Sequence, residues 1–110
     1  MDRGTAVLIL LLAALLEVGG DAIVRFGLHR SGTLPRALFF LLGALVLFAY
    51  GYTVNAPPWD FGRLLGLYVV LFFVVAQAVS WLAFGQRPTL ARVCGGLLIA
   101  AGGAVIAWFQ

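Results

Sequence analysis

Four long apolar runs limit what this chain can fold into. Turn residues divide it into segments that are expected to form helices over about 5–28, 36–54, 61–84 and 89–109. A helix needs about 20 mostly apolar residues to cross a hydrocarbon core of about 30 Å. Only 10% of the residues are charged, against about 25% in a soluble domain. The sequence therefore predicts an all-α membrane protein, with four transmembrane helices forming a single domain over residues 1–110.

The connections between these segments contain strong helix-ending signals. Residues 29–35 include Gly32 and Pro35, residues 55–60 contain paired prolines, and Gly85 occupies a C-terminal capping position. Each connection is only about six residues long, so no soluble domain fits between the spans. Any chemistry is therefore expected inside the helical bundle.

Two other interpretations of the apolar runs are weaker. The β-branched and aromatic stretch YVVLFFVV at 68–75 resembles a strand. Its place in a run of about 20 residues favours a helix, which satisfies its own backbone hydrogen bonds in lipid. A cleaved signal peptide is an alternative for the stretch from Ala6 to Leu16, but the small-residue cleavage pattern is poor and removal would leave three spans.

Several function classes have no support in the sequence. There is no P-loop, no His or Cys cluster with metal-ligand spacing and no nucleophile–base pair, so neither an enzyme nor a cofactor is expected. The net charge is +3, and the seven basic residues are all Arg. They lie beside apolar segments, where arginines orient helices and contact lipid headgroups, so the predicted partner is the lipid bilayer and not nucleic acid.

The stretch ALLEVGGDAIVRFG at 14–27 places Glu17, Asp21 and Arg25 at four-residue steps on one helix face. An ionisable group at the bilayer centre costs from about 2.5 to more than 10 kcal/mol, so its presence indicates function or a tight pair. We expect Asp21 and Arg25 to form a structural ion pair near the membrane boundary. Glu17 is left without a cation and is the predicted proton- and substrate-binding residue.

Two interpretations of Glu17 remain open. In the first, it binds protons and a cation, and the aromatic faces of Tyr68, Tyr50 and Trp81 contribute to cation binding. In the second, it stays neutral and hydrogen-bonds a neighbouring helix. The possible partners are Tyr50, Tyr52, Gln77 and Ser80.

The last apolar run carries a stripe of small residues. Its members are Gly96, Ala100, Gly103 and Ala107. Because small residues allow helices to approach closely, the stripe is predicted to form a dimer interface. Four helices with one central acid make a poor complete transporter, so a second copy or a partner chain is expected.

Several motifs resemble those of the small multidrug resistance family, within the drug/metabolite transporter superfamily. They are Glu17 followed eight residues later by Arg25, the stretch SWLAFGQRPTL at 80–90, and GGLLIAAGG at 95–103. The resemblance covers nearly the whole chain. It implies an antiparallel homodimer in a bacterial-type inner (plasma) membrane, in which two Glu17 carboxylates share protons and a substrate cation.

The chain differs from the exporters of that family in its third span. Those exporters carry an aromatic-Ser-Gly-x-Gly stretch, whereas residues 68–72 read YVVLF and keep only the aromatic residue, Tyr68. Asp21 also replaces a small or hydroxylated residue. The leading hypothesis is proton-coupled export of a small cationic or polar metabolite. A passive ion channel and a non-transporting membrane assembly partner remain alternatives.

Arginine counting and the family resemblance give different orientations. With four spans, one side carries Arg3 and Arg63 and the other carries five arginines. Those five are Arg25, Arg30, Arg36, Arg87 and Arg92. The positive-inside rule places the five in the cytoplasm, whereas an antiparallel homodimer requires almost no bias. An oppositely oriented paralogous subunit is therefore the alternative partner.

Overall fold

The computed structural model describes residues 2–109 as four helices joined by three short loops. The helices are α1 (Arg3–Leu28), α2 (Thr33–Val54), α3 (Phe61–Phe84) and α4 (Leu90–Phe109). All four are long and apolar enough to cross a membrane. The predicted all-α architecture with four transmembrane helices is confirmed, and the strand-like stretch at 68–75 lies within α3.

The helix ends follow the sequence signals except at the start of α2. This helix begins at Thr33, a few residues before the predicted position, and takes Pro35 into its first turn. Proline is tolerated there because the missing N–H has no helical partner in the first turn. At the end of α3, Gly85 adopts a φ of 67° and donates its N–H to the carbonyl of Trp81 at 3.1 Å. This left-handed conformation favours glycine and turns the chain toward α4.

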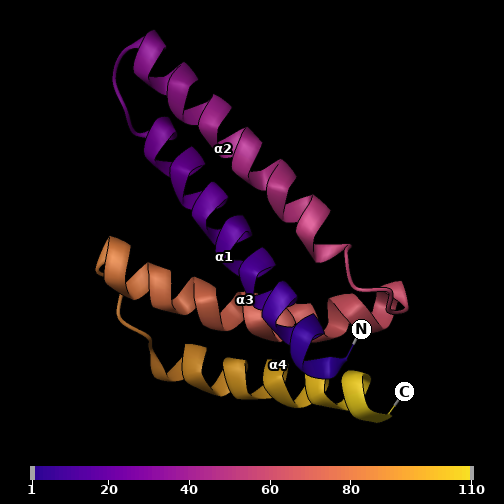
Figure 1. Cartoon of the computed structure of the whole chain (residues 1–110). Coiled ribbons are helices and arrows are strands. Elements are labelled where there is room, and N and C mark those ends of the chain that lie inside the picture. Colours follow the sequence, from indigo (N-terminus) through magenta and orange to yellow (C-terminus); the bar gives the residue numbers. More distant parts are fainter. Residues whose placement is uncertain (1, 110) are drawn as a thin grey trace.

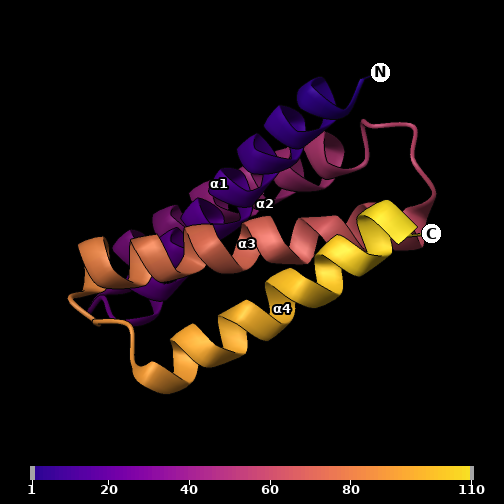
Figure 2. The same ribbon diagram turned by 90° about the horizontal axis from the view of Figure 1, so that it is seen from below.

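The four helices form two antiparallel hairpins that cross each other (Figure 1). α1 packs along α2, α4 packs against α3, and the two hairpins meet where α1 crosses α3. Figure 2 shows both termini and the α2–α3 loop at one end, with the other two loops at the opposite end. The molecule is flat, with extents of 50 × 34 × 18 Å, so most helices have two exposed sides.

A pair of glycines lies at the contact between the two helices of each hairpin. A Cβ atom at Gly43 in α2 would lie 3.3 Å from the carbonyl oxygen of Gly20 in α1. A Cβ atom at Gly103 in α4 would lie 3.1 Å from the carbonyl oxygen of Gly66 in α3 and would collide with Val70. The absence of side chains at these positions therefore lets the two helix backbones of each hairpin approach closely.

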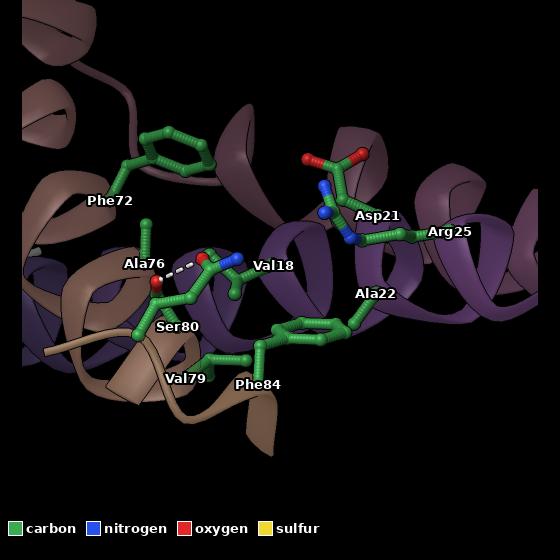
Figure 3. Close-up of a pocket in the computed structure, with 10 residues that line it drawn as sticks. Val18, Asp21, Ala22, Arg25, Phe72, Ala76, Val79, Ser80 and Phe84 are labelled. Carbon is green, nitrogen blue, oxygen red and sulfur yellow. Dashed lines mark hydrogen bonds between the residues drawn. The ribbon is translucent and has the colours of Figure 1, made fainter. Parts of the chain in front are cut away.

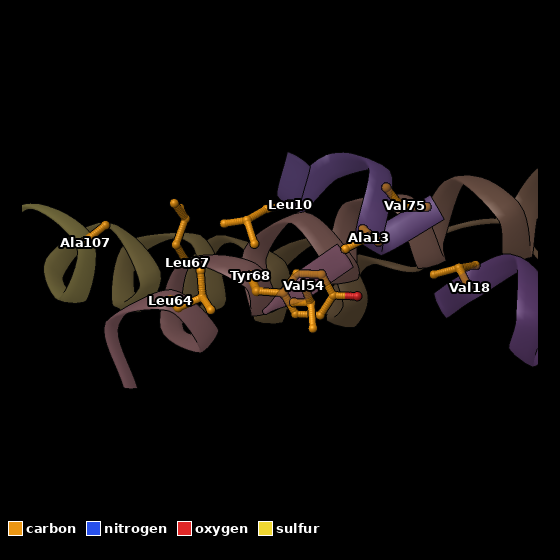
Figure 4. Close-up of a cluster of buried hydrophobic side chains, with 10 residues drawn as sticks. Leu10, Ala13, Val18, Val54, Leu64, Leu67, Tyr68, Val75 and Ala107 are labelled. Atoms are coloured by element: carbon orange, nitrogen blue, oxygen red, sulfur yellow. The ribbon is translucent and has the colours of Figure 1, made fainter. Parts of the chain in front are cut away.

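The buried core lies at the crossing of α1 and α3 (Figure 4). Leu10 and Leu64 are its largest fully buried side chains, and Val54 closes it from the end of α2. Away from this crossing, large apolar side chains are exposed, including Phe48 at 77% and Leu98 at 76%. Exposed apolar surface of this extent is expected to contact lipid or another protein.

Arg63 joins the start of α3 to the end of α4. Its Nε and Nη2 atoms donate to the carbonyl oxygen of Ala107 at 3.1 and 2.8 Å, and its guanidinium lies 5.0 Å from the ring centre of Trp59. Carbonyls in the last turn of a helix lack helical partners and carry partial negative charge. The arginine therefore supplies hydrogen-bond donors to the C-terminal end of α4 and links α3 to α4 in the second hairpin.

The small-residue stripe on α4 packs within the chain. Gly103 and Ala107 are buried, and a Cβ atom at Gly96 would lie 2.6 Å from the ring of Phe73 in α3. Ala100 lines the same groove between α3 and α4. The stripe predicted to form the dimer interface thus faces α3 of the same chain. A short loop keeps α3 beside α4, so α3 takes the close contact that the stripe permits.

Candidate functional site

A hydrogen bond between Tyr68 and Glu17 joins the two hairpins. The Tyr68 hydroxyl on α3 donates to Oε1 of Glu17 on α1 at 2.7 Å. Within residues 2–109 it is the one side-chain-to-side-chain hydrogen bond that links two helices. Tyr68 is only 4% exposed, whereas Glu17 is half-buried. The carboxylate therefore has one fixed donor and one side open to a pocket.

That pocket has a volume of about 280 Å³ and draws its lining from three helices. Its lining residues are Glu17, Tyr50, Leu65, Tyr68, Val69 and Phe72. The ring of Tyr68 lies 5.7 Å from that of Tyr50 and 6.2 Å from that of Phe72. A carboxylate beside several aromatic faces has the chemistry to attract a cation. We call this group the Glu17 pocket.

The structure brings together three of the four predicted site residues. Glu17, Tyr50 and Tyr68 share the pocket, but Trp81 is 51% exposed and lies outside it. Trp81 follows Tyr68 by 13 positions, which is a rotation of about 220° around the helix and places it on another face. Phe72 was not predicted, although its spacing of one turn from Tyr68 would have found it.

The alternative partners proposed for Glu17 have other surroundings. Tyr52 is 78% exposed, and the Ser80 hydroxyl donates to Oε1 of Gln86 at 2.8 Å. Oε1 of Gln77 is buried without a hydrogen-bond partner. Tyr50 contributes its ring to the pocket but no hydrogen bond to Glu17. The neighbouring helix thus reaches Glu17 through Tyr68.

A second pocket lies one helical turn along α1 (Figure 3). It has a volume of about 270 Å³, and its polar lining residues are Asp21, Arg25, Ser80 and Gln86. Phe72 borders both this pocket and the Glu17 pocket. We call it the Asp21 pocket.

The predicted ion pair between Asp21 and Arg25 is not formed in the structure. No hydrogen bond or salt bridge joins them, and the Arg25 guanidinium lies 5.2 Å from the ring centre of Phe84. An arginine near the end of α1 is long enough to reach an aromatic ring at the end of α3, and a cation–π contact holds it there. Asp21 therefore shares its pocket with Arg25 but forms no ion pair with it.

Within residues 2–109, no group of three or more His, Cys, Asp or Glu residues is arranged to hold a metal ion. Within residues 2–109, Glu17 and Asp21 are the two acids that lie in helices, and both are on α1. The two pockets offer a pair of carboxylates, several aromatic rings, a few neutral polar groups and the Arg25 guanidinium. Such a set can bind and release protons and organic cations.

The chain matches one family model over residues 5–110, described as "Uncharacterised BCR, YnfA/UPF0060 family". A UPF0060 membrane protein of Herpetosiphon aurantiacus is 32% identical over 94% of each chain. UPF0060 membrane protein SCO3297 of Streptomyces coelicolor is 35% identical over 87% of this chain and 84% of its own. UPF0060 membrane protein YfjF of Bacillus subtilis is 32% identical over 91% and 90%. No solved structure matches the chain.

These matches refine the resemblance drawn from the motifs. The matched family is related to the drug/metabolite transporter superfamily, and its members are named UPF0060 and not small multidrug resistance proteins. The similar bacterial proteins are all named membrane proteins, in agreement with the four spans. The chain therefore belongs to the YnfA/UPF0060 family and is a multi-pass membrane protein of a bacterial type.

Proposed function

We propose that the protein is a small proton-coupled exporter of cationic or polar metabolites, with Glu17 as its proton- and cation-binding residue. The observation that carries the proposal is the half-buried Glu17 carboxylate, which accepts a hydrogen bond from Tyr68 at 2.7 Å inside an aromatic-lined pocket. A carboxylate at this depth in a membrane is costly unless it has a partner or a function. Tyr68 supplies a donor, but within residues 2–109 no cation forms a salt bridge with Glu17.

In this mechanism the same carboxylate binds either a proton or a cation. A protonated Glu17 has no charge to attract an organic cation, whereas the ionised form does. The Tyr68 hydroxyl holds the carboxylate in position, and the rings of Tyr50 and Phe72 offer faces to the bound cation. If the bundle opens alternately to the two sides, exchange of proton for cation becomes antiport.

We propose further that the working unit contains two chains. The motif resemblance to small multidrug resistance proteins supports an antiparallel homodimer, and the five arginines at one end support an oppositely oriented paralogous partner instead. The flat shape and the exposed apolar faces of α2 and α4 are consistent with either. In both cases the second chain would contribute residues to the Glu17 pocket.

Transport into liposomes tests the proposal. Purified protein is reconstituted and offered guanidinium, tetraethylammonium and putrescine, with and without an imposed proton gradient. We expect uptake that requires the gradient, and we expect Glu17→Gln to lower it more than 100-fold, because the neutral amide cannot exchange a proton for a cation.

The control for this variant is its behaviour on size-exclusion chromatography, which should match the wild type. Undiminished gradient-driven uptake by Glu17→Gln would refute the role of Glu17. Current without a gradient would identify a passive channel. If the wild type shows neither uptake nor current with any of the three cations, the result would favour a non-transporting assembly partner.

A further inference from the structure

Asp21 is an acid inside a membrane-spanning helix, and it forms no ion pair with another residue of the described range 2–109. It lies seven residues before the end of α1 at Leu28, which is about 10 Å along the helix axis. Its side chain is exposed, and within residues 2–109 no hydrogen bond reaches its carboxylate. An ionised carboxylate at this depth is tolerated where it faces a water-filled cavity or a cation.

The surroundings of Asp21 favour a water-filled cavity. The Asp21 pocket has a volume of about 270 Å³, enough for several water molecules or one small organic ion. Ser80 lies across the pocket from the acid (Figure 3). Its hydroxyl donates to the Gln86 side chain at 2.8 Å, and the two form a neutral polar wall. Phe72 and Phe84 supply the apolar sides.

The position of this pocket suggests its role. It lies between the Glu17 pocket and the end of the bundle that holds the α1–α2 and α3–α4 loops, which carries the arginine excess. Phe72 separates the two pockets, and Asp21 is one turn from Glu17 on the same helix face. A cation that enters from this end meets Asp21 before it reaches Glu17.

We propose that the Asp21 pocket is an entry site that binds a small organic monocation ahead of the Glu17 pocket. The inference rests on the proposed function and names the group that selects positive charge at the entrance. Asp21 supplies the attraction, Phe72 supplies a ring face, and Ser80 with Gln86 supplies a neutral wall. Arg25 is the opposing charge, because it lies at the same pocket against Phe84.

This arrangement predicts effects of opposite sign at Asp21 and Arg25. If the two residues formed an ion pair, removing either charge would be harmful and the double variant would recover part of the loss. At an entry site, Asp21→Asn removes attraction and Arg25→Gln removes repulsion. The two single variants therefore separate the hypotheses by direction and not only by magnitude.

The test is equilibrium binding of tetraethylammonium and guanidinium to the purified full chain in lipid nanodiscs, by isothermal titration calorimetry at pH 8 and low salt. We expect Asp21→Asn to weaken binding about fivefold to tenfold and Arg25→Gln to strengthen it about twofold to fivefold. Tyr52→Phe, which lies outside both pockets and changes no charge, should stay within about twofold. High salt should shrink the difference between Asp21→Asn and the wild type.

The possible failures are distinguishable. Wild-type binding that is lost in Glu17→Gln but unchanged in Asp21→Asn would overturn the entry site and leave the proposed function standing. Weaker binding in both Asp21→Asn and Arg25→Gln, with recovery in the double variant, would overturn it in favour of an ion pair. No wild-type binding of either cation would overturn both proposals. If Asp21→Asn folds poorly, Arg25→Gln still gives the decisive sign, and Asp21→Glu should bind like the wild type.

Discussion

The two long faces of α3 contact their neighbours in different ways. One face presents Tyr68 and Phe72 to α1 and makes a hydrogen bond to a carboxylate beside a pocket. The other presents Gly66, Val70 and Phe73 to glycines of α4, through close apolar and backbone contacts. One helix thus combines a polar contact beside a pocket with an apolar contact that is closely packed around Gly66 and Val70.

The difference indicates which face of α3 stabilises the fold and which face can bind a ligand. A closely packed face tolerates little change in volume, because nearby atoms have no free space to occupy. A face beside a pocket has room for water or a ligand, and its side chains can change partners. We therefore expect substitutions on the α4 side of α3 to change stability, and substitutions on the α1 side to change cation binding more than stability.

The largest effect is expected for Gly103→Leu. Even a Cβ atom there would collide with Val70 and lie 3.1 Å from the carbonyl oxygen of Gly66, so the variant should lose about 3 kcal/mol of stability. Thermal unfolding in mild detergent measures this loss. Gly102→Leu is the matched control, since nothing lies within 4 Å of a Cβ atom at Gly102, and it should change stability by less than about 0.5 kcal/mol.

Equal losses of stability in Gly103→Leu and Gly102→Leu would contradict the assignment of Gly103 to the face of α4 that packs against α3. The same pair also tests dimerisation. A shift toward monomer in Gly102→Leu, without loss of stability, would place a subunit contact on the outer face of α4, where Gly95 and Gly102 are open.

A smaller effect is expected for Arg63→Gln. The variant removes a charged donor group that makes two hydrogen bonds to the Ala107 carbonyl, so we expect a loss of about 1.5 kcal/mol. Arg63→Lys should keep part of it, because an ammonium can donate but lacks the planar fork. Tetraethylammonium binding should be unchanged in both. A change in binding with unchanged unfolding temperature would show that the two faces of α3 are coupled.

Tyr68→Phe tests the polar face. It removes the hydroxyl that donates to Glu17 but keeps the ring, and we expect about 1 kcal/mol of lost stability together with altered cation binding. Tyr52→Phe is the control, because Tyr52 is 78% exposed and lies outside the Glu17 pocket. If Tyr68→Phe destabilised the protein as much as Gly103→Leu, the division between the two faces would fail.

The smallest effect is expected for Gln77→Met, and its sign is opposite. The Gln77 Oε1 atom is buried without a partner, so replacing it by an apolar group of similar length should stabilise the fold by about 0.5 kcal/mol. Gln86→Met is the comparison, because Gln86 accepts a hydrogen bond from Ser80 and its loss should bring no gain. A clear loss of stability in Gln77→Met would show that Gln77 has a partner in the membrane.

The number and extent of the helices were predictable because lipid imposes length and continuity on any span. The error at the start of α2 arose at Pro35, which a helix accepts in its first turn and excludes later. Glu17 stood out for the same physical reason as the spans, since a central acid is costly in an apolar segment. These properties belong to local sequence and need no knowledge of packing.

Which helices and side chains contact one another was not predictable in the same way. The small stripe on α4 indicated a close contact but not which helix would make it, and α3 took that place. Trp81 was selected for its aromatic ring, although its spacing of 13 positions from Tyr68 places it on another face of α3. The spacing of Asp21 and Arg25 permitted a pair, but Phe84, distant in sequence, holds the arginine.

The glycine contact between α1 and α2 has a consequence for biosynthesis. Each charged residue near the centre of a span adds about 2.5–3.5 kcal/mol to the apparent free energy of insertion by the translocon. α1 carries Glu17 and Asp21 within its span and an arginine near each end, whereas α2 carries a single arginine in its first turn. A nascent chain that stops before α2 is therefore expected to leave α1 poorly inserted, and the close approach of Gly20 to Gly43 allows both helices to enter the bilayer as a pair.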